Sequence, residues 1–342
     1  MRKVHGSSLV RGLLVVSVCG CGVSAQAATY ELKASPTTTH ISYFDATQPP
    51  VLTVESGDHV KLETASGNPR YWEKLGVPKE KIPAELYEVY KNVEGSGRSD
   101  HTLNGPIYVK GAEPGDVLEI HILSVDVRLP IAGQSFRPGG GTLPEEFPYQ
   151  KDRVLWIDLK NKTIEYAPGV KVPVHAFWGV VATAPPAEMG RVKSGPPSFY
   201  GGNMDNRHLT TGTTLYLPVS VAGGLLSIGD GHAAQGDGEV AGSAIETSLK
   251  GEIQIVLRKQ EHLKWPRAET ETQLMTIGLN PDLDEAAKIA TSQMLDFIAE
   301  RYSLTRENAY FLCSAAMDLT ISENVDGTKG VHATINKSIF GK

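Results

Sequence analysis

The chain has 342 residues and carries 39 acidic side chains against 33 lysines and arginines, so its formal net charge is −6 at pH 7. Because it has neither a basic excess nor a basic cluster, nucleic acid is not an expected partner. Three cysteines are too few for a disulfide framework. The length is sufficient for one large domain or for two closely packed ones.

The N-terminal residues have the composition of an export signal. Arg2, Lys3 and Arg11 give a basic start, and residues 12–18 form a short apolar core. Residues 25–27 (AQA) then match a small-x-small cleavage site. The apolar core is too short for a stable membrane anchor, and no later stretch is long and apolar enough to span a bilayer.

We therefore predict a signal peptide over residues 1–27 and a mature chain of residues 28–342 that is periplasmic or secreted. The signal peptide holds three basic side chains and no acidic one, so its removal leaves a net charge of −9. The alternative is lipoprotein processing, because residues 18–21 (VCGC) resemble a cleavage box that would leave a lipid on Cys21.

The first part of the mature chain, residues 28–262, has the pattern of a β protein. Short runs of alternating apolar and polar residues are separated there by turns rich in glycine, proline and aspartate. Residues 51–55 and 59–63 flank a Ser-Gly-Asp turn and predict a β-hairpin. Residues 117–125 alternate in the same way and predict a strand with one apolar face.

Clear helical patterns come late in the chain. Asp282, with a glutamate three residues later, predicts a capping box and a helix that runs to about Tyr302. A second helix is expected over residues 306–317. We predict an α+β fold with an antiparallel β-rich sandwich or barrel body over about residues 28–262, followed by a helical C-terminal part over about residues 263–342.

Residues 229–239 (GDGHAAQGDGE) are the most distinctive segment of the chain. Carboxylate, imidazole and amide side chains occur there among glycines and alanines, which predicts a loop that folds closely around a ligand. Asp230 and His232 are two residues apart and would share one face of an extended backbone. A solvated acidic turn and a calcium loop without chemistry are the alternatives. A histidine within a carboxylate cluster favours a working metal site.

Three further features could contribute to such a site. Residues 201–207 (GGNMDNR) again combine glycines with polar residues, although an Asx turn has the same composition. Residues 100–106 (DHTLNGP) place His101 shortly before a strand, where a lone histidine is more often structural. Glu246 lies in an apolar strand, and a carboxylate is costly to bury there unless it is paired or bound to a metal.

Together these motifs resemble the acetamidase/formamidase family. Residues 105–118 (GPIYVKGAEPGDVL) are similar to its N-terminal signature, and residues 201–205 and 229–246 are similar to its central ones. Residues 275–278 and 282–286 extend the similarity into the tail, so that it covers nearly the whole mature chain. The resemblance implies hydrolysis of the carbon–nitrogen bond in small linear amides such as formamide or acetamide. It also implies a homo-oligomer.

The nucleophile implied for this chain is water activated by a divalent metal. Met204 stands where some family members have a cysteine, and Cys313 lies in an apolar helical stretch. No segment has a convincing serine–lysine arrangement either. The metal is expected to be Zn²⁺, with Ca²⁺ as a second candidate or companion ion. Its predicted ligands are His101, Asp205, Asp230, His232 and Glu246.

The remaining polar side chains of the motifs receive roles around the substrate. Glu239 is the predicted general acid/base, with Asp237 as its substitute. Asn203 and Gln235 are expected to orient the carboxamide, because each offers a donor and an acceptor. An exported metal-containing binding protein without turnover and a hydrolase of a different amide-like substrate remain alternatives. A binding protein would not need the free acid/base that Glu239 represents.

We predict that the mature protein begins at an unmodified Ala28. Intact-mass and N-terminal peptide analysis of exported protein should give the mass of residues 28–342 without a lipid. A diacylglyceryl modification on Cys21 would contradict this prediction and would place the protein at a membrane surface.

Overall fold

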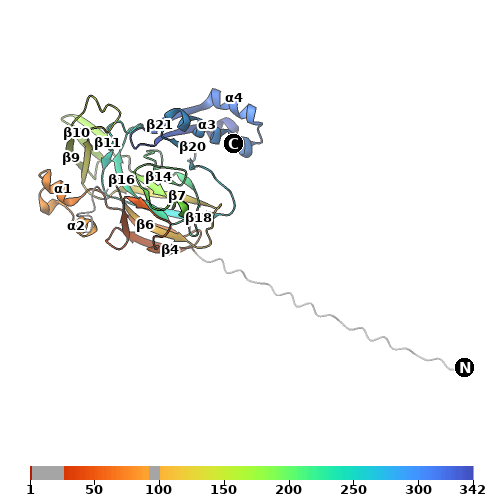
Figure 1. Ribbon diagram of the computed structural model, residues 1–342, viewed down its shortest axis with the longest axis horizontal. Coiled ribbons are helices and arrows are strands. Elements are labelled where there is room, and N and C mark those ends of the chain that lie inside the picture. The colour runs from red at the N-terminus through yellow and green to blue at the C-terminus, as the bar shows by residue number, and fades with distance from the viewer. Residues whose placement is uncertain (2–26, 92–100, 342) are drawn as a thin grey trace.

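The computed structural model describes residue 1 and residues 27–91 and 101–341. Residues 2–26, which include Cys21 and nearly all of the predicted signal peptide, lie outside them. Among the described residues, no helix is long and apolar enough to cross a membrane. The described body consists of stacked β-sheets, with the C-terminal helices at one end and the short helices of residues 69–90 on another side (Figure 1).

The first sheet contains nine strands in the order β1-β5-β18-β7-β15-β19-β20-β22-β21. Its neighbours are antiparallel except for the parallel pair β1 and β5. The strands are β1 (Thr29–Lys33), β5 (His59–Glu63), β7 (Val117–Val127), β15 (Thr214–Pro218), β18 (Leu249–Arg258), β19 (Arg267–Glu269), β20 (Gln273–Asn280), β21 (Met317–Glu323) and β22 (Lys329–Asn336).

The second sheet contains eleven strands, with the main path β11-β10-β9-β8-β17-β16-β12-β14 and with β6 joining β16 to β2 and β4. Its strands are β2 (Thr39–Ile41), β4 (Leu52–Val54), β6 (Thr102–Val109), β8 (Ile131–Phe136), β9 (Lys151–Asp158), β10 (Thr163–Ala167), β11 (Val170–Pro173), β12 (Phe177–Ala182), β14 (Gly201–Asn203), β16 (Leu226–Ala234) and β17 (Ile245–Glu246). A small two-stranded sheet pairs β3 (Tyr43–Phe44) with β13 (Val192–Lys193).

The two large sheets enclose the main hydrophobic core. From the first sheet, β7 contributes Leu118, Ile120 and Ile122, which alternate along the strand and are fully buried. From the second sheet, β16 contributes Leu226 and Ile228 to the same cluster. The predicted α+β class, with an antiparallel sandwich body and C-terminal helices, is confirmed.

In the part of the chain that the structure describes, four α-helices and three short 3₁₀ helices complete the fold. They are α1 (Pro69–Lys74), α2 (Ala84–Tyr90), α3 (Leu283–Tyr302), α4 (Arg306–Ala316), η1 (Lys79–Lys81), η2 (Ala187–Met189) and η3 (Lys337–Phe340). The first two α-helices pack Trp72 and Leu86 against Ile131 of β8 and form a separate small core beside the sandwich.

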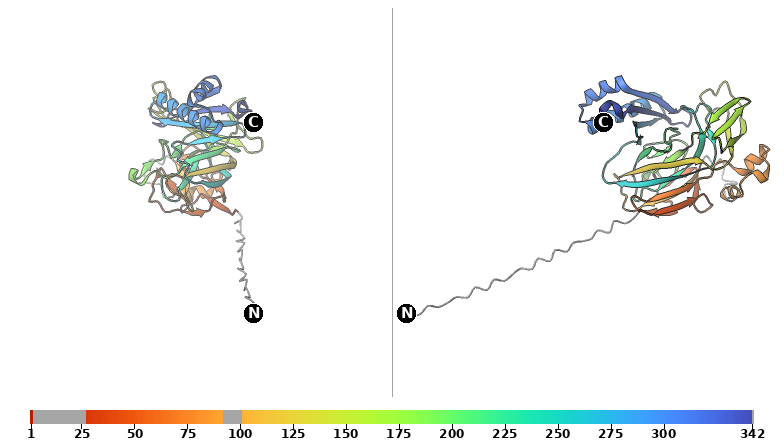
Figure 2. Two further views of the ribbon diagram at one scale, coloured as in Figure 1. Left: turned by 90° about the vertical axis from the view of Figure 1, so that its right-hand side faces the viewer. Right: turned by 180° about the vertical axis from the view of Figure 1, so that it is seen from behind.

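The C-terminal part is not purely helical, because β19, β20, β21 and β22 extend the nine-stranded sheet there. Asp282 is the N-cap of helix α3, and its side chain accepts hydrogen bonds from the backbone N–H groups of Asp284 and Glu285 as the sequence predicts. The other half of the predicted capping box does not form, because the N–H of Asp282 donates to Asn280 and the Glu285 carboxylate pairs with Lys288. It packs on β20 and β22, with α4 beside it, at one end of the molecule (Figure 2). Both faces of β20 are buried, so its sequence lacks the alternation that identifies a strand.

The predicted hairpin over residues 51–63 is wrong, because its two strands belong to different sheets. β4 pairs with β6 in the second sheet, whereas β5 pairs with β1 and β18 in the first. The turn between them is a sheet-to-sheet corner in which the Asp58 carboxylate accepts a 2.7 Å hydrogen bond from the N–H of Glu55. Alternation reveals that a segment has one buried face, but it does not identify the strand that pairs with it.

Candidate active site

The predicted glycine-rich loop is a strand through its first half. Residues 226–234 form β16, which pairs with β12, β6 and β17 inside the second sheet, and only residues after 234 leave the sheet. The glycines serve close packing rather than a turn. A Cβ atom at Gly231 would lie 2.4 Å from the backbone oxygen of Thr247. The prediction of a loop over residues 229–234 is therefore wrong, and the reason is that buried strands also need glycine where backbones approach closely.

Four of the predicted metal ligands converge at the middle of β16. Asp230 has a φ of 55° and lies where the pairing of β16 with β6 ends and its pairing with β17 begins. Its Oδ2 lies 3.2 Å from Nε2 of His232. Glu246, opposite His232 on β17, places Oε2 3.1 Å from the same nitrogen. His101, just before β6, brings its Nε2 to 3.7 Å from Oδ2 of Asp230.

Gln235 determines which nitrogen of His232 carries a proton. Its amide nitrogen donates to the backbone oxygens of Asp205, at 2.6 Å, and Ser322, at 3.4 Å. This orientation leaves Oε1 of Gln235 facing Nδ1 of His232 at 2.9 Å. A carbonyl oxygen can only accept, so Nδ1 must donate. The edge of Phe177 also packs against the ring, with centroids 4.9 Å apart and an interplanar angle of 85°.

It follows that Nε2 of His232 faces two carboxylate oxygens. With a neutral ring, its lone pair would point at Asp230 and Glu246, which is repulsive unless a cation lies between them. When no metal is bound, a second proton on Nε2 would remove this repulsion. Although burial alone lowers the pKa of His232, the charges of Glu246 and Asp230 raise it well above its usual value. A histidine that donates from one nitrogen and faces acids with the other is the arrangement of a metal ligand.

The oxygen atoms around this point also fit a cation. Asp205 Oδ1 and Glu246 Oε2 are buried and have no hydrogen-bond partner among the described residues, although both lie within 3.7 Å of a ring nitrogen of His232. Gly179 of β12 leaves the space open. A Cβ there would be 2.4 Å from Oδ1 of Asp205 and 2.6 Å from Oδ2 of Asp230. Buried carboxylate oxygens that lack a hydrogen bond and surround an open space match the donor set of a divalent ion.

Glu239 belongs to a second group of acids on the other side of His232. A ligand atom from each of Asp205, His232 and Glu239 lies within 4.8 Å of the others. Burial, followed by the charge of Glu239, raises the pKa of Asp205 well above its usual value. Burial, together with the charges of Asp326 and Glu246, does the same for Glu239. A carboxyl group held in its protonated form is suited to donate a proton.

Sequence reasoning missed two acids of this group. Asp326 and Glu323 lie at the connection between β21 and β22, and Glu323 forms a β-bridge with Gly238. Burial raises the pKa of Asp326, and it raises the pKa of Glu323 to about 8. The only signal in the sequence was residues 323–327 (ENVDG), which have the composition of an ordinary turn.

The other predicted site residues have different positions. Asn203, at the end of β14, donates a 2.8 Å hydrogen bond to Asp326, and its buried Oδ1 has no partner among the described residues. Gln235 has its amide engaged by protein groups, so it positions His232 instead of orienting a substrate. Asp237 pairs with His208 at 3.4 Å. It is not part of the His232 cluster, but it lines the same cavity as Glu239, so its role as a substitute for Glu239 stays a prediction.

A cavity of about 480 Å³ opens beside this cluster. Glu239 and Gln235 line it together with His175 and Arg207, and Val174 and neighbouring aliphatic side chains form the apolar part of its wall. The acid whose pKa is raised is thus accessible to a small molecule from one side. A volume of this size lies within the usual range of about 300–1,000 Å³ for ligand pockets.

A model of the acetamidase/formamidase family matches residues 35–194 and 191–342. This chain belongs to the acetamidase/formamidase family. The match confirms the resemblance found in the sequence motifs and covers both the sandwich and the C-terminal layer.

Two relatives carry the names of the family's activities. The formamidase of Methylophilus methylotrophus is 30% identical over 193 residues, which are 41% of this chain and 47% of that enzyme. The acetamidase of Mycolicibacterium smegmatis is 28% identical over 198 residues, 41% of this chain and 49% of that enzyme. The matched part therefore spans about half the length of these two relatives.

Solved structures of the family resemble the chain over nearly its full length. The acetamidase from Bacillus halodurans is 32% identical, with a TM-score of 0.78 over 91% of this chain and 98% of the other. The acetamidase from Yersinia enterocolitica is 27% identical, with a TM-score of 0.79 over 94% of this chain and 96% of the other. The acetamidase/formamidase fold thus includes the extended sheet and the helices on it.

We expect Gly179→Ala to weaken cation binding while leaving the fold intact. The new methyl group would displace the carboxylates of Asp205 and Asp230, and overpacking of this kind costs about 1–3 kcal/mol. If the metal-bound state is destabilised by this amount relative to the metal-free state, the affinity for zinc drops by about 5- to 150-fold. Zinc titration of the metal-free protein measures the change. Gly195→Ala, where a Cβ meets nothing within 4 Å, is the control, and equal affinity in both variants would contradict the prediction.

Proposed function

We propose that this member of the acetamidase/formamidase family is an exported, metal-dependent amidohydrolase that cleaves the carbon–nitrogen bond of linear amides into ammonia and a carboxylate. Membership of the family supports the reaction class, because its named relatives are formamidases and acetamidases. The observation that carries the metal dependence is His232, whose Nε2 faces Asp230 and Glu246 while Gln235 holds the proton on Nδ1.

In this proposal the ligands of the divalent ion are Asp230, His232 and Glu246, with His101 and Asp205 beside them. Ligand atoms of the first three lie within 4.8 Å of one another. Zn²⁺ suits the imidazole and carboxylate donors, and the oxygen-rich surroundings keep Ca²⁺ as a second candidate. Bound there, the ion would act as a Lewis acid and lower the pKa of a coordinated water.

The protein's own groups supply the proton transfer and the positioning. Glu239 lines the cavity, and its raised pKa keeps a proton available for the departing nitrogen, since an amide anion leaves very poorly. The amide oxygen of Asn203 has no partner among the described residues and suits the N–H of a carboxamide. Burial and the negative charges of Asp326 and Glu246 oppose the ionisation of Glu239.

The cavity supports an amide substrate that can be larger than formamide. It measures about 480 Å³, whereas formamide has three non-hydrogen atoms. Its aliphatic wall, which includes Val172, Val174 and Val240, would accommodate an apolar acyl chain. An assay panel should therefore extend from formamide and acetamide to longer aliphatic amides.

The predicted signal peptide supports a periplasmic or secreted location for this activity. Residues 1–27 combine a basic start, a short apolar core and a small-x-small end. In this location the enzyme would act on amides before they enter the cytoplasm.

We expect His232→Ala and Glu239→Gln to separate metal binding from proton transfer. His232→Ala should release the ion and abolish turnover, because it removes the nitrogen that faces both Asp230 and Glu246. Glu239→Gln should retain the ion and slow turnover by about 10²–10⁴-fold, the usual contribution of general acid–base catalysis. The measurement is metal content per chain beside the rate of ammonia release from the amide panel.

Two surface substitutions of the same types control for folding and handling. Glu165→Gln on β10 and His262→Ala after β18 change exposed side chains and should leave both readouts as in the wild type. A metal-free Glu239→Gln protein would make Glu239 a ligand, consistent with its place beside Asp205 and His232. A wild-type protein that binds no divalent ion and releases no ammonia from any amide would exclude the proposed function.

We also propose that the protein forms a homo-oligomer through the end of the molecule built by α4 and β21. β21 is the edge strand of the nine-stranded sheet and exposes Leu319 and Ile321. α4 exposes Tyr310 and Phe311, the latter by 77%. Large exposed apolar side chains at an open sheet edge are typical of subunit contacts.

We expect light scattering to give the mass of a dimer or a larger closed assembly. Replacing Phe311 and Leu319 with glutamate should shift the mass to that of a monomer, because each substitution places a charge in an apolar contact. Val170→Glu on β11, at the edge of the other sheet and also exposed, is the matched control. A wild-type protein that is monomeric at all concentrations would contradict the proposal.

A further inference from the structure

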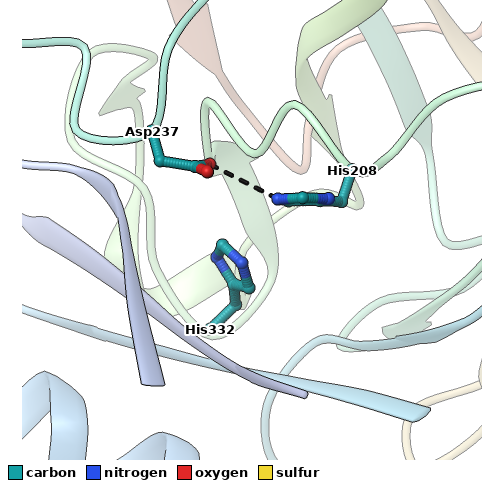
Figure 3. Close-up of side chains that lie close together, drawn as sticks. All are labelled: His208, Asp237 and His332. Atoms are coloured by element: carbon teal, nitrogen blue, oxygen red, sulfur yellow. Dashed lines mark ion pairs between the residues drawn. The ribbon is translucent and has the colours of Figure 1, made fainter. Parts of the chain in front are cut away.

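A second group of metal-ligand residues lies outside the His232 cluster. His208 comes from the connection between β14 and β15, Asp237 from the segment after β16, and His332 from the middle of β22. One ligand atom from each lies within 4.8 Å of the others. Figure 3 shows the three side chains pointing toward one another, with the ion pair between His208 and Asp237 closing one side.

His332 is the fixed member of this group. It is 1% exposed, and its Nδ1 lies 2.8 Å from the hydroxyl of Ser322 on the neighbouring strand β21. Burial, with a smaller contribution from the charge of His208, lowers its pKa to about 4, so the ring is neutral at pH 7. When Nδ1 donates to Ser322, Nε2 keeps its lone pair. A histidine held by a hydrogen bond at one nitrogen and free at the other is ready to bind a metal.

The distances require only a small adjustment for a zinc-like ion. Two ligands of a tetrahedral Zn²⁺ are about 3.3 Å apart when the bonds are about 2.0–2.1 Å. Nε2 of His208 and Oδ1 of Asp237 are already 3.4 Å apart. The rings of His208 and His332 have centroids 4.8 Å apart and planes tilted by 58°. The side chains of His208 and Asp237 are 40% and 32% exposed, so they can move toward the buried histidine, and water can complete the coordination.

The position of the group connects it to the active site without sharing a ligand with it. Asp237 precedes Glu239 by two residues and lines the same cavity. His332 belongs to the C-terminal layer, which also supplies Glu323 and Asp326. An ion on these three residues would therefore tie the segment that carries Glu239 to the nine-stranded sheet.

We propose that His208, Asp237 and His332 form a second divalent-cation site of the zinc class, which is separate from the catalytic ion and fixes the segment carrying Glu239. Two imidazoles and one carboxylate, with one position open to water, are a frequent donor set for zinc. The site depends on the fold described above and not on the proposed amidase activity.

Zinc binding in a protein that lacks the catalytic ligand tests the proposal. Metal-free His232→Ala protein should still bind about one Zn²⁺ per chain in a titration with a competing chelator. Adding His208→Ala should weaken that binding by more than about 100-fold, because loss of a ligand should exceed the 10- to 100-fold effect of losing an outer hydrogen bond. Ser322→Ala, which removes the hydrogen bond to His332, should weaken it by about 10- to 100-fold.

A matched histidine and a second readout make the result unambiguous. His175→Ala removes another histidine of the same cavity and should leave this zinc affinity unchanged. Co²⁺ in place of Zn²⁺ should give the visible absorption of a four-coordinate site, and His208→Ala should remove it. In the wild-type background, His208→Ala should lower the zinc content by about one ion per chain. The proposal can therefore be tested even if the His232→Ala protein folds poorly.

The outcomes distinguish this proposal from the catalytic one. Wild type and His232→Ala could each bind one zinc ion per chain, with that binding lost in His208→Ala. This result would confirm the second site and would exclude an ion at the His232 cluster. If His232→Ala binds no zinc, or if His208→Ala binds it as tightly as its parent, the three residues are an ion pair beside a structural histidine and the proposal is wrong.

Discussion

The structure is organised around the burial of several carboxyl groups beside one histidine whose tautomer is fixed. Removing an ionised carboxylate from water costs several kcal/mol even after the protein relaxes, so the acids must be neutralised, paired or bound to a cation. Gln235 decides how this is done, because its hydrogen bond places the proton of His232 on Nδ1 and directs Nε2 toward Asp230 and Glu246. Gly179 keeps the space between the acids open.

Asp230 and Glu239, one from each group of acids, have pKa values shifted in opposite directions, because their surroundings differ. Although burial alone would raise the pKa of Asp230, the charges of His101 and His232 lower it to about 2, so it stays ionised. On the other side of the ring, burial and the surrounding negative charges keep the pKa of Glu239 high. Neighbouring carboxyl groups with pKa values displaced in opposite directions are the usual basis for one residue binding a cation while another transfers a proton.

The C-terminal layer takes part in the site and does more than cover the sheet. β21 and β22 extend the nine-stranded sheet, and their connection brings Glu323 and Asp326 against the segment that follows β16. The backbone oxygen of Ser322 holds Gln235, and its hydroxyl holds His332. Helices α3 and α4 stabilise this arrangement by burying an apolar face on β20 and β22. The geometry of the site therefore depends on contacts between segments about 90 residues apart.

The sequence by itself determined the secondary-structure classes, the capping of α3 at Asp282, the family, and the concentration of three acids and one histidine in residues 229–239. These properties are local, because periodicity, capping and donor chemistry are expressed within a few residues. Only the tertiary structure decided which groups meet. It assigned β4 and β5 to different sheets, removed Asp237 from the His232 cluster, gave Gln235 a positioning role, and added Asp326 and Gly179. Strand register over long sequence separations fixes such partnerships, and a local pattern carries no information about it.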